Sequence, residues 1–120
     1  MDREWDDTQP IYRQLRGRIV AMILEGVLKE GDAIPSVRTV ATDYRLNHLT
    51  VLRAYQELVD ENLVEMRRGR GMFVNAGARD LLMRSERQKF LEEEWPRIRE
   101  KIQRLGLTAK ELLRKREEKR

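Results

Sequence analysis

The chain has 120 residues, of which 40% are hydrophobic and 38% are charged, so it can form one small domain with an appendage and a strongly ionic surface. It contains no cysteine, which excludes disulfides and thiolate metal sites. No apolar run is long enough to span a membrane, and the acidic stretch Asp2–Asp7 is unlike a signal peptide. We therefore expect a protein of the reducing cytoplasm.

The first predicted helix spans about Ile11–Glu25, where apolar residues recur at helical spacing. Pro10 suits its first turn and Gly26 suits its C-terminal exit. We interpret the apolar stripe as core and assign it no direct function. Leu28–Asp32 then forms a turn, and residues 33–34 are expected to pair with a later strand through a single bridge.

Two short helical patterns follow, and they are the most informative part of the chain. Ser36 is a candidate N-cap for the first, which extends to Tyr44. The second runs from Asn47 to Glu61, with Asn47 or His48 at its start. Only residues 44–46 separate the two patterns, so the second helix must pack across the first, as in a helix-turn-helix.

A basic hairpin is predicted after the second pattern. Leu63–Arg67 and Met72–Val74 are candidate strands, and the sequence Arg68-Gly69-Arg70-Gly71 separates them. Glycines allow a close backbone approach, and arginines suit a phosphate backbone, so this hairpin is typical of the wing of a winged helix-turn-helix.

Charge is segregated along the chain even though the formal net charge is only +4. Residues 1–78 hold 11 Lys or Arg and 12 Asp or Glu, so this half is not basic overall. Its arginines nevertheless fall on the elements expected to face a duplex. The local electrostatic potential at these elements matters more for DNA binding than the net charge of the whole half. These arginines are Arg38, Arg45, Arg53, Arg67, Arg68 and Arg70. Acidic residues occupy the leading tail and the far end of the second pattern.

The segment Pro10–Val74 resembles the DNA-binding domain of the GntR family of bacterial transcription regulators. Its motifs, in order, are Pro10-Ile11-Tyr12, Leu28-Lys29-Glu30-Gly31-Asp32, Ile34-Pro35-Ser36-Val37-Arg38, Asn62-Leu63-Val64 and Arg68-Gly69-Arg70-Gly71-Met72-Phe73-Val74. The tripeptide Arg53-Ala54-Tyr55 and the short tail resemble the YtrA subgroup in particular. Other subgroups carry a large effector-binding or aminotransferase-like domain in place of such a tail.

The resemblance implies a set of DNA-contacting residues. Arg38 matches the position from which the family's arginine reaches DNA, and the first turns of the second pattern enter a major groove. The wing is expected at the minor groove or its flanking phosphates. The predicted set is Ser36, Arg38, Asn47, His48, Thr50, Arg53, Arg68, Gly69 and Arg70.

Members of this set also have a structural explanation, such as a solvated surface charge for Arg38 or a plain polar turn for the wing. Asn47 also suits a helix cap, and capping is compatible with a DNA contact. His48 is the only histidine, and without cysteine or carboxylate partners at ligand spacing it forms no metal site. We therefore interpret His48 as a donor to a base edge or a phosphate.

Leu49 and Leu52 depart from many family members, which carry polar or basic residues at these positions. Leu49 can touch a thymine methyl group in the major groove. Alternatively, both leucines pack against the neighbouring helix, and the sequence favours neither interpretation. No operator sequence can therefore be predicted.

The tail follows a short hinge at residues 75–78 and is helical from about Asp80. Its apolar residues alternate at spacings of four and three, as in a coiled coil, and this tail stripe is the candidate dimer interface. The stripe consists of Leu91, Trp95, Ile98, Ile102 and Leu105. The alternative is that the stripe folds back on the winged domain of its own chain. A two-fold interface with a second copy suits a stripe that contains tryptophan better.

Two sequence signals divide the tail further. Pro96 is expected to kink or split the helix near residues 92–95. Gly106 ends it, and Thr108 with Glu111 forms a capping box for a last helix, so the tail is predicted to be a helical hairpin.

The sequence thus predicts a mainly α protein with a small β-hairpin wing. Residues 1–8 form a flexible acidic tail, 9–77 the winged helix-turn-helix and 78–120 the helical dimerisation tail. The expected function is a transcription repressor that binds double-stranded DNA as a homodimer on a palindromic operator, located in the bacterial cytoplasm and at the nucleoid when bound. No cofactor is implied, and an effector, if one exists, is not visible in the sequence.

Two other classes of protein fit the sequence less well. An enzyme is disfavoured because the chain lacks a phosphate-binding glycine motif, a catalytic triad and a metal cluster. The second rival is an adaptor that uses the tail and the winged domain to hold proteins. The arginine-rich wing argues against it, and a salt-dependent shift of DNA would separate the two classes.

Overall fold

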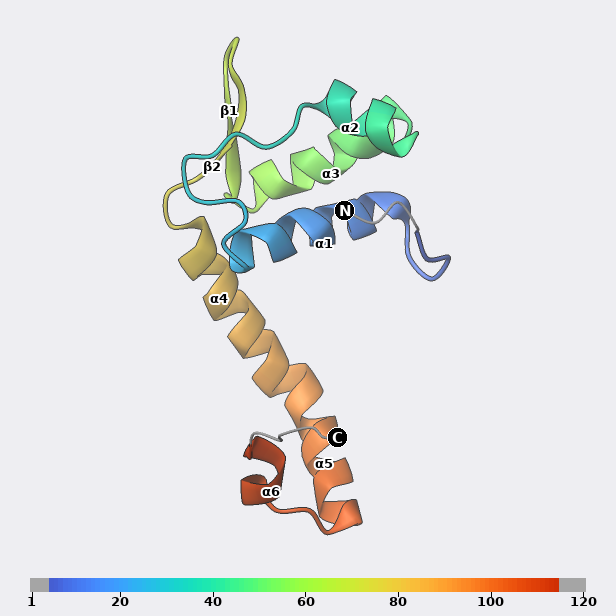
Figure 1. The fold of residues 1–120 in the computed structure, drawn as a ribbon, viewed down its shortest axis with the longest axis vertical. Helices are drawn as coiled ribbons and strands as arrows, with labels where there is room; N and C mark the ends of the chain where they lie inside the picture. Colours follow the sequence, from blue (N-terminus) through green and yellow to red (C-terminus); the bar gives the residue numbers. More distant parts are fainter. Residues whose placement is uncertain (1–4, 115–120) are drawn as a thin grey trace, which may run out of the picture. The chain divides into compact units, whose positions relative to one another are not determined.

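The computed structural model describes residues 5–114 and contains two compact units (Figure 1). The winged unit extends to Met83, and the tail unit begins at Arg84. The start of the predicted acidic tail, residues 1–4, and the end of the predicted dimerisation tail, residues 115–120, lie outside the described residues.

Three helices form the body of the winged unit: α1 (Ile11–Leu24), α2 (Val37–Tyr44) and α3 (His48–Asp60). Their positions confirm the three predicted helices to within two residues at each end. α3 packs against both α1 and α2, because its apolar face meets the apolar stripes of both neighbours (Figure 1).

The helix-turn-helix is set by local capping. The Ser36 Oγ accepts a hydrogen bond from the backbone N–H of Thr39 at 3.0 Å, which confirms Ser36 as the N-cap of α2. Arg45 ends α2 in the left-handed conformation, with a φ of 55°. The backbone N–H of Leu46 then returns to the Ala41 carbonyl at 2.9 Å, so the chain turns sharply into α3.

The wing is a two-stranded antiparallel hairpin of β1 (Val64–Arg67) and β2 (Gly71–Val74), as predicted. Val64 pairs with Val74 at its base and Arg67 pairs with Gly71 near its tip. The expected single bridge is also present, between Ala33 and Phe73. The hairpin projects beyond the helices (Figure 1).

Tyr55 lies at the centre of the winged core and is almost fully buried. Its hydroxyl donates a hydrogen bond to the Pro35 carbonyl at 2.6 Å, so it ties α3 to the segment that leads into α2. Burial, and secondarily the neighbouring Tyr44, raises the pKa of the Tyr55 phenol, which therefore stays protonated and keeps donating.

α4 (Ala78–Lys89) begins inside the winged unit. Ala78 and Leu82 are buried in the same core as the three helices and the wing. The compact winged unit therefore extends past the 75–78 hinge, where the sequence alone places the boundary.

The tail unit continues with a π-helical turn, η1 (Phe90–Glu94), followed by α5 (Trp95–Leu105) and α6 (Ala109–Leu113). Pro96 has no backbone N–H, so it cannot donate a hydrogen bond to the carbonyl one turn earlier. The helical hydrogen-bond pattern therefore changes beside it. The Trp95 N–H accordingly donates to the Phe90 carbonyl, five residues back. The interruption lies where the sequence predicts it.

The end of the hairpin also follows the sequence signals. Gly106 adopts a φ of 70° at the end of α5. The Thr108 side chain accepts from the Glu111 N–H at 3.2 Å, and the Glu111 carboxylate accepts from the Thr108 N–H at 2.9 Å. This is the predicted capping box.

Candidate nucleic-acid interface

The first turn of α3 presents polar groups to solvent. Asn47 is the N-cap, and its Oδ1 accepts from the Leu49 N–H at 2.7 Å. His48 is exposed at the first helical position, and Thr50 is half-buried. Asn47 therefore does cap the helix, and its cap holds the start of α3 in a defined geometry.

Leu49 and Leu52 are on the surface, with 71% and 45% of their area exposed. At 100° per residue they lie opposite the buried face of α3, on the same exposed face as Arg53 and Gln56. The structure thus disfavours the interpretation that the two leucines pack against the neighbouring helix.

Arg53 is exposed, and its side chain lies against α1. Its guanidinium stacks over the ring of Tyr12 on α1, 3.9 Å from the ring centroid. A cation above an aromatic face is attracted by the negative potential of the ring, so Tyr12 holds the Arg53 side chain in place on the flank of α3.

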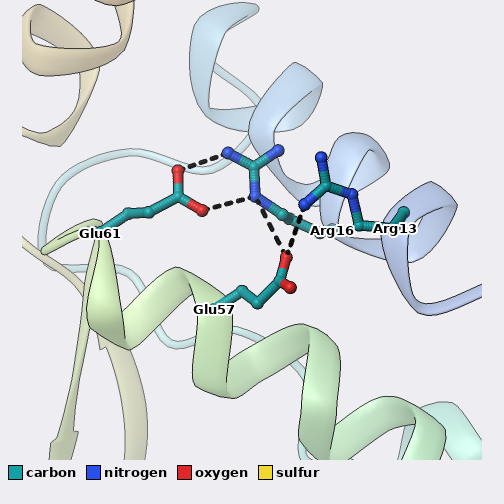
Figure 2. Close-up of polar contacts among 4 residues, drawn as sticks. All are labelled: Arg13, Arg16, Glu57 and Glu61. Atoms are coloured by element: carbon teal, nitrogen blue, oxygen red, sulfur yellow. Dashed lines mark hydrogen bonds and ion pairs between the residues drawn. The ribbon is translucent and has the colours of Figure 1, made fainter.

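Acidic residues at the end of α3 are paired with arginines of α1 (Figure 2). Arg16 makes a fork-shaped contact with Glu61, in which Nε lies 2.7 Å from Oε2 and a second nitrogen contacts Oε1. Glu57 lies between Arg13 and Arg16, at 3.4 and 3.9 Å. We call these four residues the α1–α3 ion network, and it neutralises carboxylates that would otherwise repel DNA.

The N-terminus of α2 lies beside the wing. Ser36 and Arg70 line one cleft of about 220 Å³, whose lining also includes Tyr55 and Met72. Arg38, in the first turn of α2, is exposed and has no ion pair or ring contact within residues 5–114. Two of the predicted DNA-contacting elements therefore share one surface.

Three arginines at the tip of the wing, Arg67, Arg68 and Arg70, differ in the contacts that their side chains make. Gly69 and Gly71 have φ values of 73° and 106°, which side chains rarely tolerate, so glycine is required for this turn. Arg67 stacks on Phe73 and pairs with Glu65, and Arg70 lies 5.7 Å from the same ring.

Arg68 lies at the exposed tip of the wing. In the described part of the chain it has neither an ion pair nor a ring contact. Its guanidinium is therefore available to a phosphate.

The predicted tail stripe lies on the surface of the tail unit. Three of its members, Trp95, Ile98 and Ile102, line an apolar groove of about 250 Å³ between α5 and α6, and the remaining lining is also apolar. Leu91 and Leu105 are exposed outside this groove. We call this hollow the tail groove.

Residues 11–74 match the family model described as bacterial regulatory proteins, gntR family. The chain belongs to the GntR family. The HTH-type transcriptional repressor YtrA of Bacillus subtilis (strain 168) is 37% identical over 84 residues, which cover 70% of this chain and 65% of the repressor. The uncharacterized HTH-type transcriptional regulator YhcF of the same strain is 32% identical over 119 residues, covering 94% of this chain and 92% of the relative.

A solved structure of a GntR family transcriptional regulator from Listeria monocytogenes superposes with a TM-score of 0.73 at 27% identity, over 91% of this chain and 94% of that chain. The winged helix-turn-helix fold is thereby confirmed. This GntR chain is a DNA-binding transcription regulator, and its relatives are regulators rather than enzymes.

Sequence reasoning missed two contacts of the GntR domain that involve aromatic residues. One is the Tyr12–Arg53 stack described above. The other involves Trp5, which lies edge-on to Tyr44 with ring centroids 6.3 Å apart and carries the Arg18 guanidinium 3.9 Å above its ring. For the second contact the sequence offers one signal, a tryptophan within a charged tail.

The Gln14 side chain binds the backbone of Asp6, the residue after Trp5. The Gln14 amide nitrogen donates to the Asp6 carbonyl at 2.7 Å, and its oxygen accepts from the Asp6 N–H at 2.9 Å. Trp5 and Asp6 of the predicted flexible tail thus contact the GntR domain.

Other kinds of site are absent from the described part of the chain in two respects. Within residues 5–114, no three His, Cys, Asp or Glu side chains converge as metal ligands. In the same range, no helix has the length and apolarity needed to cross a bilayer.

Proposed function

We propose that this GntR regulator is a homodimeric repressor that binds a palindromic operator, with the tail unit as its dimer interface. The observation that carries the proposal is the apolar tail groove on a small helical unit. η1, α5 and α6 have no buried residue in the described chain. Apolar surface of this kind is stabilised by a second copy of the same surface.

The geometry of the tail groove suits a two-fold interface. Its lining combines one large aromatic side chain with aliphatic ones from two helices. In an isologous contact, Trp95 of one protomer enters the groove of the other, and the reverse contact forms by symmetry. Trp95 is the proposed anchor because an indole removes more apolar area from water than any other side chain.

The winged unit then supplies the DNA contacts. His48, Thr50 and Asn47 at the start of α3 face the major groove, with Arg53 on the flank in its stacked position. Ser36 and Arg38 of α2 contact the adjacent phosphates. The wing, through Arg68, Gly69 and Arg70, contacts the minor groove or its phosphates.

A dimer is needed because one winged unit makes few contacts. Two copies held about 34 Å apart, one helical turn, contact two half-sites of a palindrome. Repression is proposed because the YtrA relative is named a transcriptional repressor. The proposal also allows for a small-molecule effector, whose chemistry it does not specify.

The test compares two variants that introduce the same carboxylate into α5. Ile98→Glu places it in the tail groove, and Gln103→Glu places it on the exposed polar face of the same helix. Sedimentation of each full-length variant gives the oligomeric state, and titration of a palindromic and a half-site duplex gives the affinity.

We expect Ile98→Glu to be monomeric and to lose its preference for the palindrome, while Gln103→Glu resembles the unmodified protein. The far-ultraviolet circular dichroism of both should be unchanged. A dimeric Ile98→Glu variant would refute the tail interface. A protein that is monomeric without substitution and binds half-sites as well as palindromes would refute the dimer itself.

A further inference from the structure

We propose that Leu49 and Leu52 recognise the 5-methyl groups of thymine in the major groove, so that the operator half-site contains thymines at one or two fixed positions. This inference rests on the proposed DNA contact of α3 and deepens it by naming the base feature that is recognised.

The exposure of the two leucines is the first observation. They are 71% and 45% exposed on a short helix whose other apolar residues form the core. Leu49 is in the first turn, where the Asn47 cap fixes the backbone. The first turns of a recognition helix are the ones that reach base edges, so an apolar pair at this place meets bases rather than solvent.

The second observation concerns the polar residues on the same face of α3. Arg53 stacks on Tyr12, and the Gln56 amide donates to the Asp60 carboxylate at 3.0 Å. Both long polar side chains beside the leucines are therefore engaged within the protein. The face offers an apolar surface in its middle and has few unengaged donors for base edges.

The charge around this face favours a duplex over a protein partner. Arg38 and Arg45 are exposed on α2 and in the turn that leads into α3, and both suit phosphates. Within the major groove of B-DNA, the thymine methyl is the apolar group that distinguishes one base pair from the others. An apolar pair on α3, with exposed arginines on the preceding helix and turn, is complementary to a thymine flanked by phosphates.

The spacing of the two leucines limits where the thymines lie. Residues three apart on a helix have their Cβ atoms about 5–6 Å apart. Base pairs rise about 3.4 Å, so the two side chains reach base pairs that are adjacent or separated by one. The contacted thymines are therefore expected within a single short run of each half-site.

The test begins with the full-length protein selecting duplexes from a random-sequence library. The selected duplex is then resynthesised with deoxyuridine in place of each thymidine in turn. Deoxyuridine keeps the hydrogen-bonding groups of thymidine and lacks only the methyl. Affinities are measured by fluorescence anisotropy for the unmodified protein, Leu49→Ala, Leu52→Ala and the control Val27→Ala, which truncates a 60% exposed side chain in the turn after α1.

At one or two positions of a half-site, deoxyuridine should weaken binding by the unmodified protein and by Val27→Ala about fourfold, the effect of one buried methyl group. The same replacement should leave the affinity of Leu49→Ala or Leu52→Ala unchanged, because the methyl no longer has its partner. This loss of sensitivity identifies which leucine faces which thymine.

Three results would overturn the proposal. Sequence-specific binding that is insensitive to deoxyuridine at every position refutes methyl recognition and leaves the proposed function standing. Alanine variants with unchanged DNA affinity and unchanged deoxyuridine sensitivity assign the leucine face to another partner, such as a protein. A selection that enriches no sequence refutes the proposed operator binding and this inference together.

Discussion

The winged unit and the tail unit carry similar aliphatic and aromatic side chains but place them differently. Leu15, Leu58 and Tyr55 of the winged unit are at most 1% exposed, whereas Leu91, Leu105 and Leu113 of the tail are on the surface. Burial of this kind is what stabilises a small domain. The winged unit therefore has the core of an independently folding domain, whereas the tail unit keeps exposed the apolar surface that the proposed dimer would bury.

The same difference applies to polar contacts. The winged unit ties distant segments together, through the Tyr55 hydroxyl and through the α1–α3 ion network. The described hydrogen bonds and ion pairs of the tail unit are local, such as the Thr108–Glu111 capping box. Local bonds define a helix and its ends, and they do not bury its apolar face.

The difference in burial between the two units predicts that the same leucine-to-alanine change has a large effect in one and a small effect in the other. Leu58→Ala should lower the free energy of unfolding by about 2–5 kcal/mol, because Leu58 is fully buried. Leu113→Ala, at an 85% exposed position, should change it by less than about 0.5 kcal/mol. Urea denaturation at a concentration where the protein is monomeric provides both values. Equal losses would mean that the tail shares the core.

A second prediction separates two parts of the winged unit. His48→Ala should relax sequence preference and cost about 1–3 kcal/mol on the operator, because a base contact is lost. Arg68→Ala should instead weaken binding to operator and random DNA alike and lower the dependence of affinity on salt, because a phosphate contact is lost. Titrations of the operator and of random DNA at several salt concentrations measure both the sequence preference and the salt dependence of each variant. Equal effects of the two variants would contradict the assigned roles.

Arg45→Gly should change the stability of the protein and its affinity for DNA in opposite directions. A residue other than glycine with a φ of 55° is strained, so Arg45→Gly should raise the free energy of unfolding by about 0.5–1 kcal/mol. The same variant should bind DNA less tightly, because it loses an exposed cation beside α3. Thermal unfolding and a DNA titration on one preparation measure both effects. A variant of lower stability would show that Arg45 is not strained.

The smallest expected effect concerns the α1–α3 ion network. Glu61→Gln should lower the free energy of unfolding by about 0.2–1 kcal/mol, since the side chains of this pair are 23% and 41% exposed. Glu30→Gln removes the same charge from an exposed glutamate that has no ion pair among the described residues, and it serves as the charge control. Urea denaturation at low and high salt should show the Glu61→Gln effect shrinking as salt rises.

Features determined by near neighbours in the chain were predictable from the sequence. Ser36 was predicted as a cap because serine before an apolar pattern satisfies free N–H groups, and Gly106 was predicted as a helix end because it tolerates a positive φ. The wing was predictable because glycines punctuate two short strands. The GntR domain carries these signals densely, so its elements could be placed closely.

Contacts between residues far apart in the chain were not predictable. The stack of Tyr12 and Arg53 depends on the rotation of α1 relative to α3, which periodicity leaves open. The roles of Leu49 and Leu52 were undecided for the same reason. Their sequence pattern fits either side of α3, and only the packing against α1 and α2 selects the exposed one.

The α1–α3 ion network also has a consequence for the rate at which the protein captures DNA. Glu57 and Glu61 would slow the diffusional approach of a phosphate backbone, and the paired arginines cancel much of their far field. Removing Arg16 would leave Glu61 without its arginine and Glu57 paired with Arg13 alone. Association would then slow while dissociation of the formed complex stayed nearly constant, so these ion pairs set how often an encounter is productive.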